Sequence, residues 1–308
     1  MTALKRADPR DVAAPAPCTG TCPPSSRPVR TFAYETRSAA LSSRFRIPHP
    51  GGKDHALPAQ ELLAFGNVSL LEGSFADEDV LREGFRGCDG AFVDIGGFDT
   101  GEKIETYWVI RSYEIAIEEG IKFFVYGNLD YALKKSGYDS RFRTGHYDGK
   151  GRMAEWVLFQ NEKNSDRMGA AVFTPGPYIE DGIVTWRVPL GEGAVPHVAI
   201  EHMTYADMAV AFEKVTRNPA QYIDTDLETY WNSPDLTGIT DRSAGYNADP
   251  HDKSTMSFRD NFTGFWNVWK RGIITRDYAL LDEIHPDRIR TAESAVLKSS
   301  ADFRTGML

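Results

Sequence analysis

The chain has 308 residues, of which 41% are hydrophobic and 26% are charged, proportions that are ordinary for a globular protein. Its length suits one large domain or two small ones, and its formal net charge of −9 argues against direct binding to nucleic acid or to an anionic membrane. The three cysteines form no disulfide framework and no metal-ligand spacing, so we predict a reducing, cytoplasmic setting and no metal site.

The first segment, residues 1–45, differs in composition from the rest of the chain. It is rich in Pro, Ser, Ala and Arg and has almost no apolar periodicity. Such a segment buries too little surface to offset the entropy cost of ordering it. We therefore predict a disordered tail, or an aberrant N-terminus from an incorrect exon choice.

Residues 46–175 alternate between strand and helix patterns. Short apolar runs predict strands at 67–73, 90–95, 121–127 and 168–174, and the segments between them predict helices at 76–87, 101–120 and 148–161. The apolar residues of the second helix that we expect on one side are Ile104, Tyr107, Trp108, Ile110, Ile115 and Ile117. Short connections between such elements favour parallel pairing, so the fold class is α/β, with a doubly wound, mostly parallel, Rossmann-like sheet.

Residues 176–308 lose this rhythm. Short strands and turns are predicted for 181–200, and a helix for 204–217, so this part is expected to be a smaller α+β substrate or cap region. A second helix, 257–272, carries aromatic residues at helical spacing: Phe258, Phe262, Phe265, Trp266 and Trp269. The simplest interpretation is core packing, and the alternative is a face for a homodimer or another partner.

Ligands of doubly wound sheets bind outside the carboxyl ends of the strands, which directs attention to the residues that follow each predicted strand. Four consecutive strand ends carry small, polar or aromatic groups, at 73–75, 95–101, 125–130 and 174–180. Each end alone would pass for an ordinary turn. Together they predict a site for a flat ligand.

His146 and Lys150 lie four residues apart at the start of a predicted helix, so their side chains share one face. A histidine there could exchange a proton with a carbonyl or alcohol near neutral pH, and a lysine could hold a ribose hydroxyl. The competing interpretation is the polar, solvated end of a helix. Spacing alone does not decide between the two.

Residues 118–157, EEGIKFFVYGNLDYALKKSGYDSRFRTGHYDGKGRMAEWV, strongly resemble the NmrA-like family, an atypical branch of the short-chain dehydrogenases/reductases. The segment GNVSLLEGSFADEDVLREGFRGCDGAFVDIGGF fits the same family, and the resemblance covers roughly residues 60–290. It implies a Rossmann sheet that binds NADP(H). Some members are redox sensors that bind transcription factors, as in fungal nitrogen metabolite repression, and others are reductases of secondary metabolism.

Carried over by position, the resemblance implies that Lys150 holds the nicotinamide ribose and that His146 stands where a typical dehydrogenase has its catalytic tyrosine. The region of the catalytic serine corresponds to Gly127 and Asn128. Arg46, or Arg44 beside it, would meet a 2′-phosphate. The other implied cofactor contacts are Ser74 and Phe75 at the adenine, Ile95, Gly96, Gly97 and Phe98 at the adenosine ribose and pyrophosphate, and Tyr178, Ile179 and Glu180 near the nicotinamide and substrate.

The chain departs from the family pattern because nothing before Asn67 matches the expected glycine-rich turn, G-x-x-G-x-x-G. The loss of several phosphate hydrogen bonds, each worth about 1.5–3 kcal/mol, would weaken cofactor binding by orders of magnitude. The sequence favours an NADP-dependent oxidoreductase acting on a small carbonyl or alkene, because ligand-facing groups occur at four strand ends. The alternatives are a non-catalytic NADP-sensing regulator that binds a transcription factor in the cytoplasm or nucleus, and a truncated product with impaired cofactor binding.

Overall fold

A computed structural model describes residues 2–3, 45–49, 68–176, 193–195, 197–199, 201–245, 254–291 and 293–294. Most of the predicted N-terminal tail lies outside these residues, as do Tyr178, Ile179 and Glu180. The chain divides into two compact units, which are described separately below. Unit 1 comprises residues 1–95, 107–127 and 156–171, and unit 2 comprises 96–106, 128–155 and 172–308. The domain boundaries inferred from composition stay a prediction.

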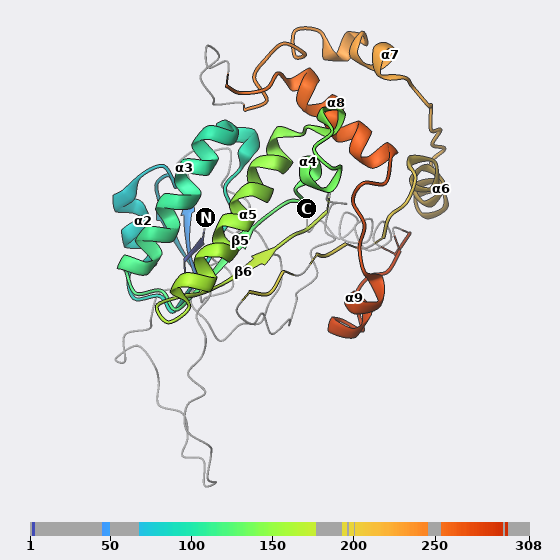
Figure 1. Ribbon diagram of the computed structural model, residues 1–308. Coiled ribbons are helices and arrows are strands. Elements are labelled where there is room, and N and C mark those ends of the chain that lie inside the picture. Colours follow the sequence, from blue (N-terminus) through green and yellow to red (C-terminus); the bar gives the residue numbers. More distant parts are fainter. Residues whose placement is uncertain are drawn as a thin grey trace. The chain divides into compact units, whose positions relative to one another are not determined.

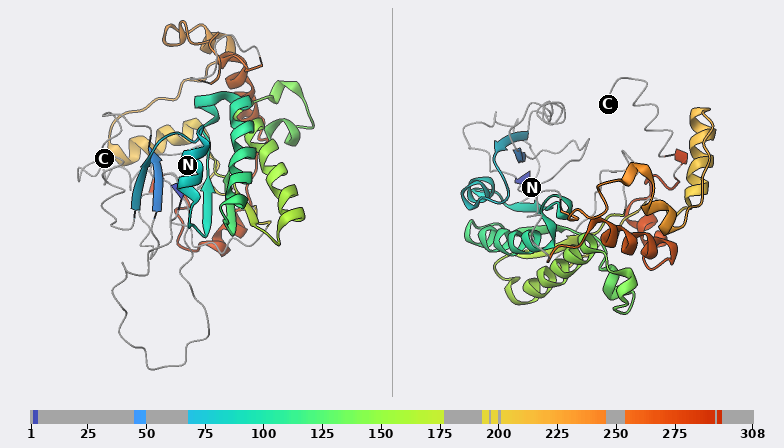
Figure 2. Two further views of the ribbon diagram at one scale, coloured as in Figure 1. Left: turned by 90° about the vertical axis from the view of Figure 1, so that its left-hand side faces the viewer. Right: turned by 90° about the horizontal axis from the view of Figure 1, so that it is seen from above.

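A six-stranded sheet confirms the predicted α/β class (Figure 1). Its order is β3 (Val68–Glu72), β2 (Phe45–His49), β1 (Thr2–Ala3), β4 (Gly90–Val93), β5 (Phe123–Gly127) and β6 (Gly169–Phe173). The pairs β2–β3 and β4–β5 are parallel, and the left view of Figure 2 shows β2 and β3 as neighbouring blue arrows. This order is that of a doubly wound dinucleotide sheet, in which the first strand is central.

The central position is held by β1, which is antiparallel to both neighbours. Ala3 pairs with Arg46 of β2, and Thr2 pairs with Phe92 of β4. The carboxyl end of β1 therefore points to the edge opposite the carboxyl ends of β2 and β4. The residues that follow it, LKRADPR, contain no glycine. In its polarity β1 thus differs from the first strand of a dinucleotide-binding sheet, which runs parallel to its neighbours.

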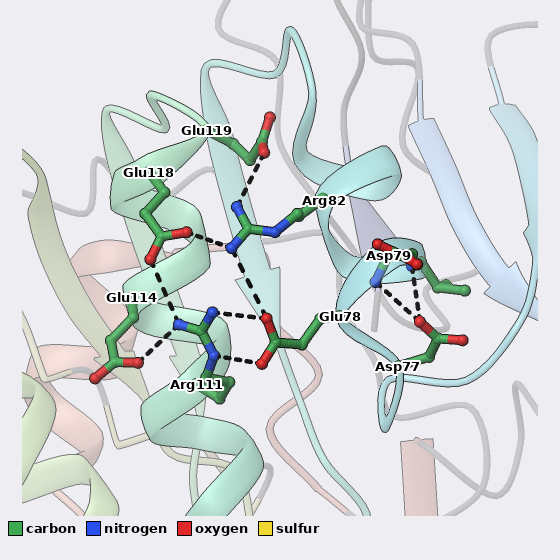
Figure 3. A network of polar contacts seen from close by, with 9 residues as sticks. Asp77, Glu78, Asp79, Arg82, Arg111, Glu114, Glu118 and Glu119 are labelled. Atoms are coloured by element: carbon green, nitrogen blue, oxygen red, sulfur yellow. Dashed lines mark hydrogen bonds and ion pairs between the residues drawn. The ribbon is translucent and has the colours of Figure 1, made fainter.

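Helix α2 (Glu78–Phe85) begins at Asp77, whose carboxylate accepts hydrogen bonds from the backbone N–H groups of Asp79 and Val80. Such a cap satisfies N–H groups that lack partners within the helix. Two arginines then connect α2 to helix α3 (Gly97–Glu118), as Figure 3 shows. Arg111 of α3 binds both carboxylate oxygens of Glu78 at 2.7 Å, and Arg82 of α2 pairs with Glu118 and Glu119.

Helix α3 starts four residues earlier than predicted, at Gly97, and bends at Gly101, where φ is 75°. Its predicted apolar side is partly wrong, because Ile104 and Tyr107 are 40% and 55% exposed. The side that faces inward follows a spacing of four, three and four residues. Its buried members include Glu105, Val109, Ser112 and Ala116.

Helix α5 (Gly145–Asn164) runs beside α3, and its last turn helps to place β6 (Figure 1). The side-chain carbonyl of Asn161 accepts a hydrogen bond of 2.7 Å from the backbone N–H of Ala170, at the start of that strand. In unit 1 the ring of Tyr113 on α3 meets the rings of Phe124 on β5 and Trp156 on α5 at 5.2 and 5.3 Å between centroids. Edge-on aromatic contacts of this kind join the helices to the sheet.

Unit 2 contains the helices α4 (Ala132–Lys135), α6 (Tyr205–Thr216), α7 (Leu227–Trp231), α8 (Phe258–Lys270) and α9 (Tyr278–Ile284), with short 3-10 turns η2 (Ser140–Phe142) and η3 (Pro234–Leu236). Its core bears out part of the packing predicted for the aromatic stripe of α8: Phe265 and Trp269, both partly buried, contact a buried cluster of Ala132, Phe142, Tyr147, Val268 and Ile274. In the part of the chain described here, no helix has the length and hydropathy to cross a membrane.

A glycine on α8 sets how closely that helix approaches η2. A Cβ atom at Gly264 would lie 1.9 Å from the carbonyl oxygen of Arg143, which is backbone and cannot rotate away. We therefore expect Gly264→Ala to lower the free energy of unfolding by about 2 kcal/mol or more, within the range for overpacked cores. Urea titration measures this change. Lys270→Ala, at an exposed site of the same helix, is the control and should change it by less than about 1 kcal/mol. Equal effects of the two variants would contradict the close approach.

Candidate functional site

Three of the predicted site residues, Gly97, His146 and Lys150, belong to unit 2 and lie on α3 and α5. Ser74, Phe75 and Ile95 belong to unit 1: Ser74 is exposed, Phe75 is partly buried and Ile95 is buried. Gly96 is exposed beside the start of α3. Phe98 lies in the first turn of α3, and Arg46 lies in β2. The cofactor roles assigned to these residues stay predictions.

His146 lies in the first turn of α5 and is only 5% exposed. Its ring nitrogen Nδ1 contacts the side-chain amide of Asn261 on α8, at 3.1 Å from Oδ1 and 2.9 Å from Nδ2. The rings of Phe262 and Phe265 lie 5.7 and 6.0 Å from the imidazole ring, between centroids. The predicted proton donor is therefore enclosed by α8.

This enclosure lowers the pKa of His146 to about 4, mainly because burial disfavours the charged imidazolium. The contact with Asn261 acts in the opposite direction, and the positive charge of Lys150 lowers the pKa further. His146 is thus neutral at pH 7. A neutral imidazole with such a low pKa is a poor proton donor near neutrality.

Lys150 is 7% exposed and pairs with a carboxylate that no pattern analysis singled out. Its ammonium nitrogen Nζ lies 3.2 Å from Oε1 of Glu105, whose side chain is completely buried on α3. A charge pair of this kind costs desolvation energy on both sides and is sustained by its mutual attraction. The ammonium predicted to hold a ribose thus already has an anionic partner within the protein.

The absence of a side chain at Gly97 allows the Glu105 carboxylate to fit between the helices, whereas a Cβ at Gly149 would make only an ordinary contact with it. A Cβ at Gly97 would stand 2.4 Å from Oε2 of Glu105, and a Cβ at Gly149 would stand 3.4 Å from the same atom. Gly97 is one of the positions that the family resemblance assigns to the pyrophosphate. The carboxylate of Glu105 therefore contacts both Gly97 and Lys150, two predicted ligand positions on different helices.

A second carboxylate, that of Glu102, accepts from two arginines at the same helix pair. Arg143 Nη2 lies 2.6 Å from Oε2 of Glu102, and Arg152 Nη1 lies 3.0 Å from Oε1. Gly145 leaves room for it, since a Cβ there would lie 3.0 Å from Oε2. A small hollow beside these groups is lined by Gly97, Gly101, Glu102, Gly145, His146, Ala244, Thr255 and Met256.

The start of α5 is fixed by Asp148, whose carboxylate is buried. Oδ2 accepts a hydrogen bond of 2.8 Å from the backbone N–H of Thr144, and Oδ1 accepts one of 2.9 Å from that of Leu133. Arg143 adds a contact of 3.1 Å to Oδ2. Because these bonds hold the first turn of α5, the orientations of His146 and Lys150 are set by the fold.

Sequence reasoning missed Glu105 and Asn261 for different reasons. Glu105 had a detectable signal: it lies four residues before Val109 and seven before Ser112, on the line of α3 that is buried. A carboxylate on that line needs a cationic partner, and Lys150 supplies it. Asn261 had none, because it meets His146 across 115 residues of sequence.

The residues described here do not fit a nicotinamide ribose at Lys150. A ribose hydroxyl on that ammonium would have to share it with the carboxylate of Glu105, and a phosphate at Gly97 would have to displace Oε2 of the same carboxylate. An anionic ligand would in addition face the negative charge of that carboxylate at close range. The contacts predicted for a ligand at Lys150 and Gly97 are thus made by the protein's own side chain.

No protein-family model matches this sequence, and no curated protein matches it either. Among solved structures, the chain is similar to a nucleoside-diphosphate-sugar epimerase from Staphylococcus aureus, with a TM-score of 0.55 and 12% identity over 82% of this chain and 90% of that chain. It is also similar to the Citrobacter sp. triphenylmethane reductase complexed with NADP(H), with a TM-score of 0.52 and 11% identity over 80% and 87% of the two chains. A third similar structure is the Escherichia coli NADPH-dependent quinone oxidoreductase complexed with NADPH. Its TM-score is 0.53, and it is 14% identical over 78% of this chain and 86% of that chain.

At these identities the likeness shows the fold alone. The structural neighbours are reductase- and epimerase-type proteins, and this chain shares their Rossmann-like architecture.

The low pKa of His146 makes stability depend on pH. In the unfolded chain the imidazole takes up a proton below about pH 6.5, whereas in the folded chain it does so only below about pH 4. The contribution of His146 is therefore complete above pH 6.5 and falls by up to about 3 kcal/mol between pH 6.5 and 4. We expect His146→Gln to remove this loss. Urea unfolding of both proteins between pH 7 and 4 measures it, and parallel pH curves would contradict the buried, neutral histidine.

If Glu105 and Lys150 act as a pair, removing one charge and removing both should have different effects on the free energy of unfolding. Glu105→Gln leaves the buried ammonium of Lys150 without its carboxylate, so we expect a loss of about 3–5 kcal/mol in the free energy of unfolding. Combining Glu105→Leu with Lys150→Met removes both charges and should restore stability to within about 1 kcal/mol of the parent. Unfolding in urea at pH 7 tests both. Additive losses in the double variant would show that the two side chains do not act as a pair.

Proposed function

We propose that this protein is a non-catalytic, regulator-type binding protein built on the scaffold of the NAD(P)-dependent reductases. On this proposal it does not transfer hydride, and it acts through contacts with a partner. The observation that supports it is the commitment of both members of the predicted catalytic pair to internal contacts, His146 with Asn261 and Lys150 with Glu105.

Two properties of these contacts weigh against turnover. His146 has a pKa of about 4, so it lacks the proton that a general acid must donate at pH 7. Lys150 neutralises a buried carboxylate, and its withdrawal to hold a ribose would leave Glu105 as an uncompensated charge. A catalytic site normally has its groups arranged around an open place for the reacting atoms. Here both groups already contact other side chains of the protein.

The scaffold adds a second argument. In a dinucleotide fold the first strand leads into a glycine-rich turn whose N–H groups hold the pyrophosphate. In this chain β1 runs antiparallel to its neighbours, and no glycine-rich turn precedes Asn67. Several hydrogen bonds to phosphate are lost with that turn, which supports weak rather than tight binding of NADP(H).

The nature of the partner comes from the family resemblance alone. NmrA-like regulators bind transcription factors, and we propose a partner of that class for this chain. The alternative of an oxidoreductase acting on a small carbonyl or alkene draws on the neighbours, which include proteins named as quinone oxidoreductase and triphenylmethane reductase. The two functions differ in one measurable property, the consumption of NADPH.

The test follows the absorbance of NADPH with the full chain and a panel of quinones, aldehydes and activated alkenes at pH 7. We expect no consumption above the rate without protein, and no change in Lys150→Met. Three NADPH-dependent reductases, one for quinones, one for aldehydes and one for activated alkenes, are each added to the matching mixtures to show that the substrates are competent. Consumption by the parent protein that disappears in Lys150→Met would overturn the proposal and restore the oxidoreductase interpretation.

A further inference from the structure

We infer that Glu105 acts as an internal ligand that closes an anion site between α3 and α5, and that its removal opens this site to a nucleotide. The inference deepens the proposed function, because it names the group that excludes the dinucleotide from Lys150. It concerns residues of unit 2 only, with Gly97 and Glu105 on α3 and Lys150 on α5.

The contacts of Glu105 are those expected for a bound anion. One carboxylate oxygen, Oε1, lies 3.2 Å from the ammonium of Lys150, as a phosphate oxygen or a ribose hydroxyl would. The other, Oε2, lies against the backbone of Gly97, close enough that a Cβ there would stand 2.4 Å away. A glycine lets a ligand atom approach the backbone this closely. The carboxylate thus uses a cation and an open backbone at the same time.

Packing alone gives a weak reason for this arrangement. Glu105 is fully buried and Lys150 is 7% exposed, so both charges lie where water is largely excluded. Pairs of this kind are often no more stabilising than apolar side chains of the same size. The pair does keep a negative charge, the carboxylate of Glu105, beside Lys150 and Gly97 when no ligand is bound.

The position of Glu105 in α3 gives it a way to leave. The helix bends at Gly101, where φ is 75°, and the first turn, residues 97–100, is separated from the rest by this bend. Glu105 follows one turn after the bend. A rotation of its side chain would uncover Gly97 and Lys150 together, without any change in the backbone of α5. A nucleotide phosphate or ribose could then take the two contacts that the carboxylate gives up.

The experiment compares NADPH binding to four proteins by isothermal titration calorimetry at pH 7: the parent, Glu105→Ala, Glu105→Ala combined with Lys150→Met, and Glu114→Ala. Glu114 lies on the same helix, is half exposed and carries the same charge, so its variant controls for net charge. We expect Glu105→Ala to bind NADPH at least about tenfold more tightly than the parent. The double variant should lose this gain, and Glu114→Ala should bind like the parent.

Folding is checked by circular dichroism and thermal melting of each protein. Glu105→Ser, which is smaller and polar, replaces Glu105→Ala if the latter fails to fold, with the same expectation. Equal affinity of the parent and the Glu105 variant would overturn the inference, and so would a gain that persists in the Lys150→Met background. Neither result involves NADPH consumption, so failure here leaves the proposed function intact. NADPH consumption by the parent that depends on Lys150 would defeat both, because the dinucleotide would then reach Lys150 with Glu105 in place.

Discussion

The buried pair of Glu105 and Lys150 is the constraint on which the arrangement of α3 and α5 depends. Two opposite charges that lie away from water are tolerable only while they remain in contact. The helices must therefore approach closely at this point, and Gly97 makes the approach sterically feasible. Any side chain larger than a hydrogen atom at position 97 would clash with the carboxylate of Glu105. The ion pair in its present position therefore requires a glycine at position 97.

This constraint also determines what the histidine next to it does. His146 lies one turn before Lys150, between that ammonium and the aromatic rings of α8. An apolar wall and a nearby positive charge both disfavour the imidazolium, and one amide contact with Asn261 does not compensate. Even with Glu105 beside it, the ammonium still lowers the pKa of His146. The ammonium of Lys150 thus has two effects: it binds the carboxylate of Glu105, and it helps to keep the imidazole of His146 unprotonated.

The scaffold was predictable because its signals are local and redundant. Buried strands such as 121–127 read as continuous apolar runs, and the short connections leave few topologies for them. The aromatic line of α8 likewise implied its own burial, and Phe265 and Trp269 do pack inward. The strand β1 was missed because two residues, Thr2 and Ala3, carry no periodicity. Its place depends on open edges of β2 and β4, a tertiary property.

The site was less predictable because it depends on single polar residues and on contacts between distant segments. Apolar periodicity predicted that Ile104 and Tyr107 lie on the buried side of α3, but these two side chains are exposed and Glu105 is buried instead. A rule that weights charge would have found it, since a glutamate in line with Val109 and Ser112 requires a buried cation. Packing over many residues maintains the α/β scaffold, whereas one carboxylate decides whether Lys150 is available to a ligand. A fold of this kind can therefore persist while its ligand site is closed, because nothing in the sheet depends on which anion the ammonium holds.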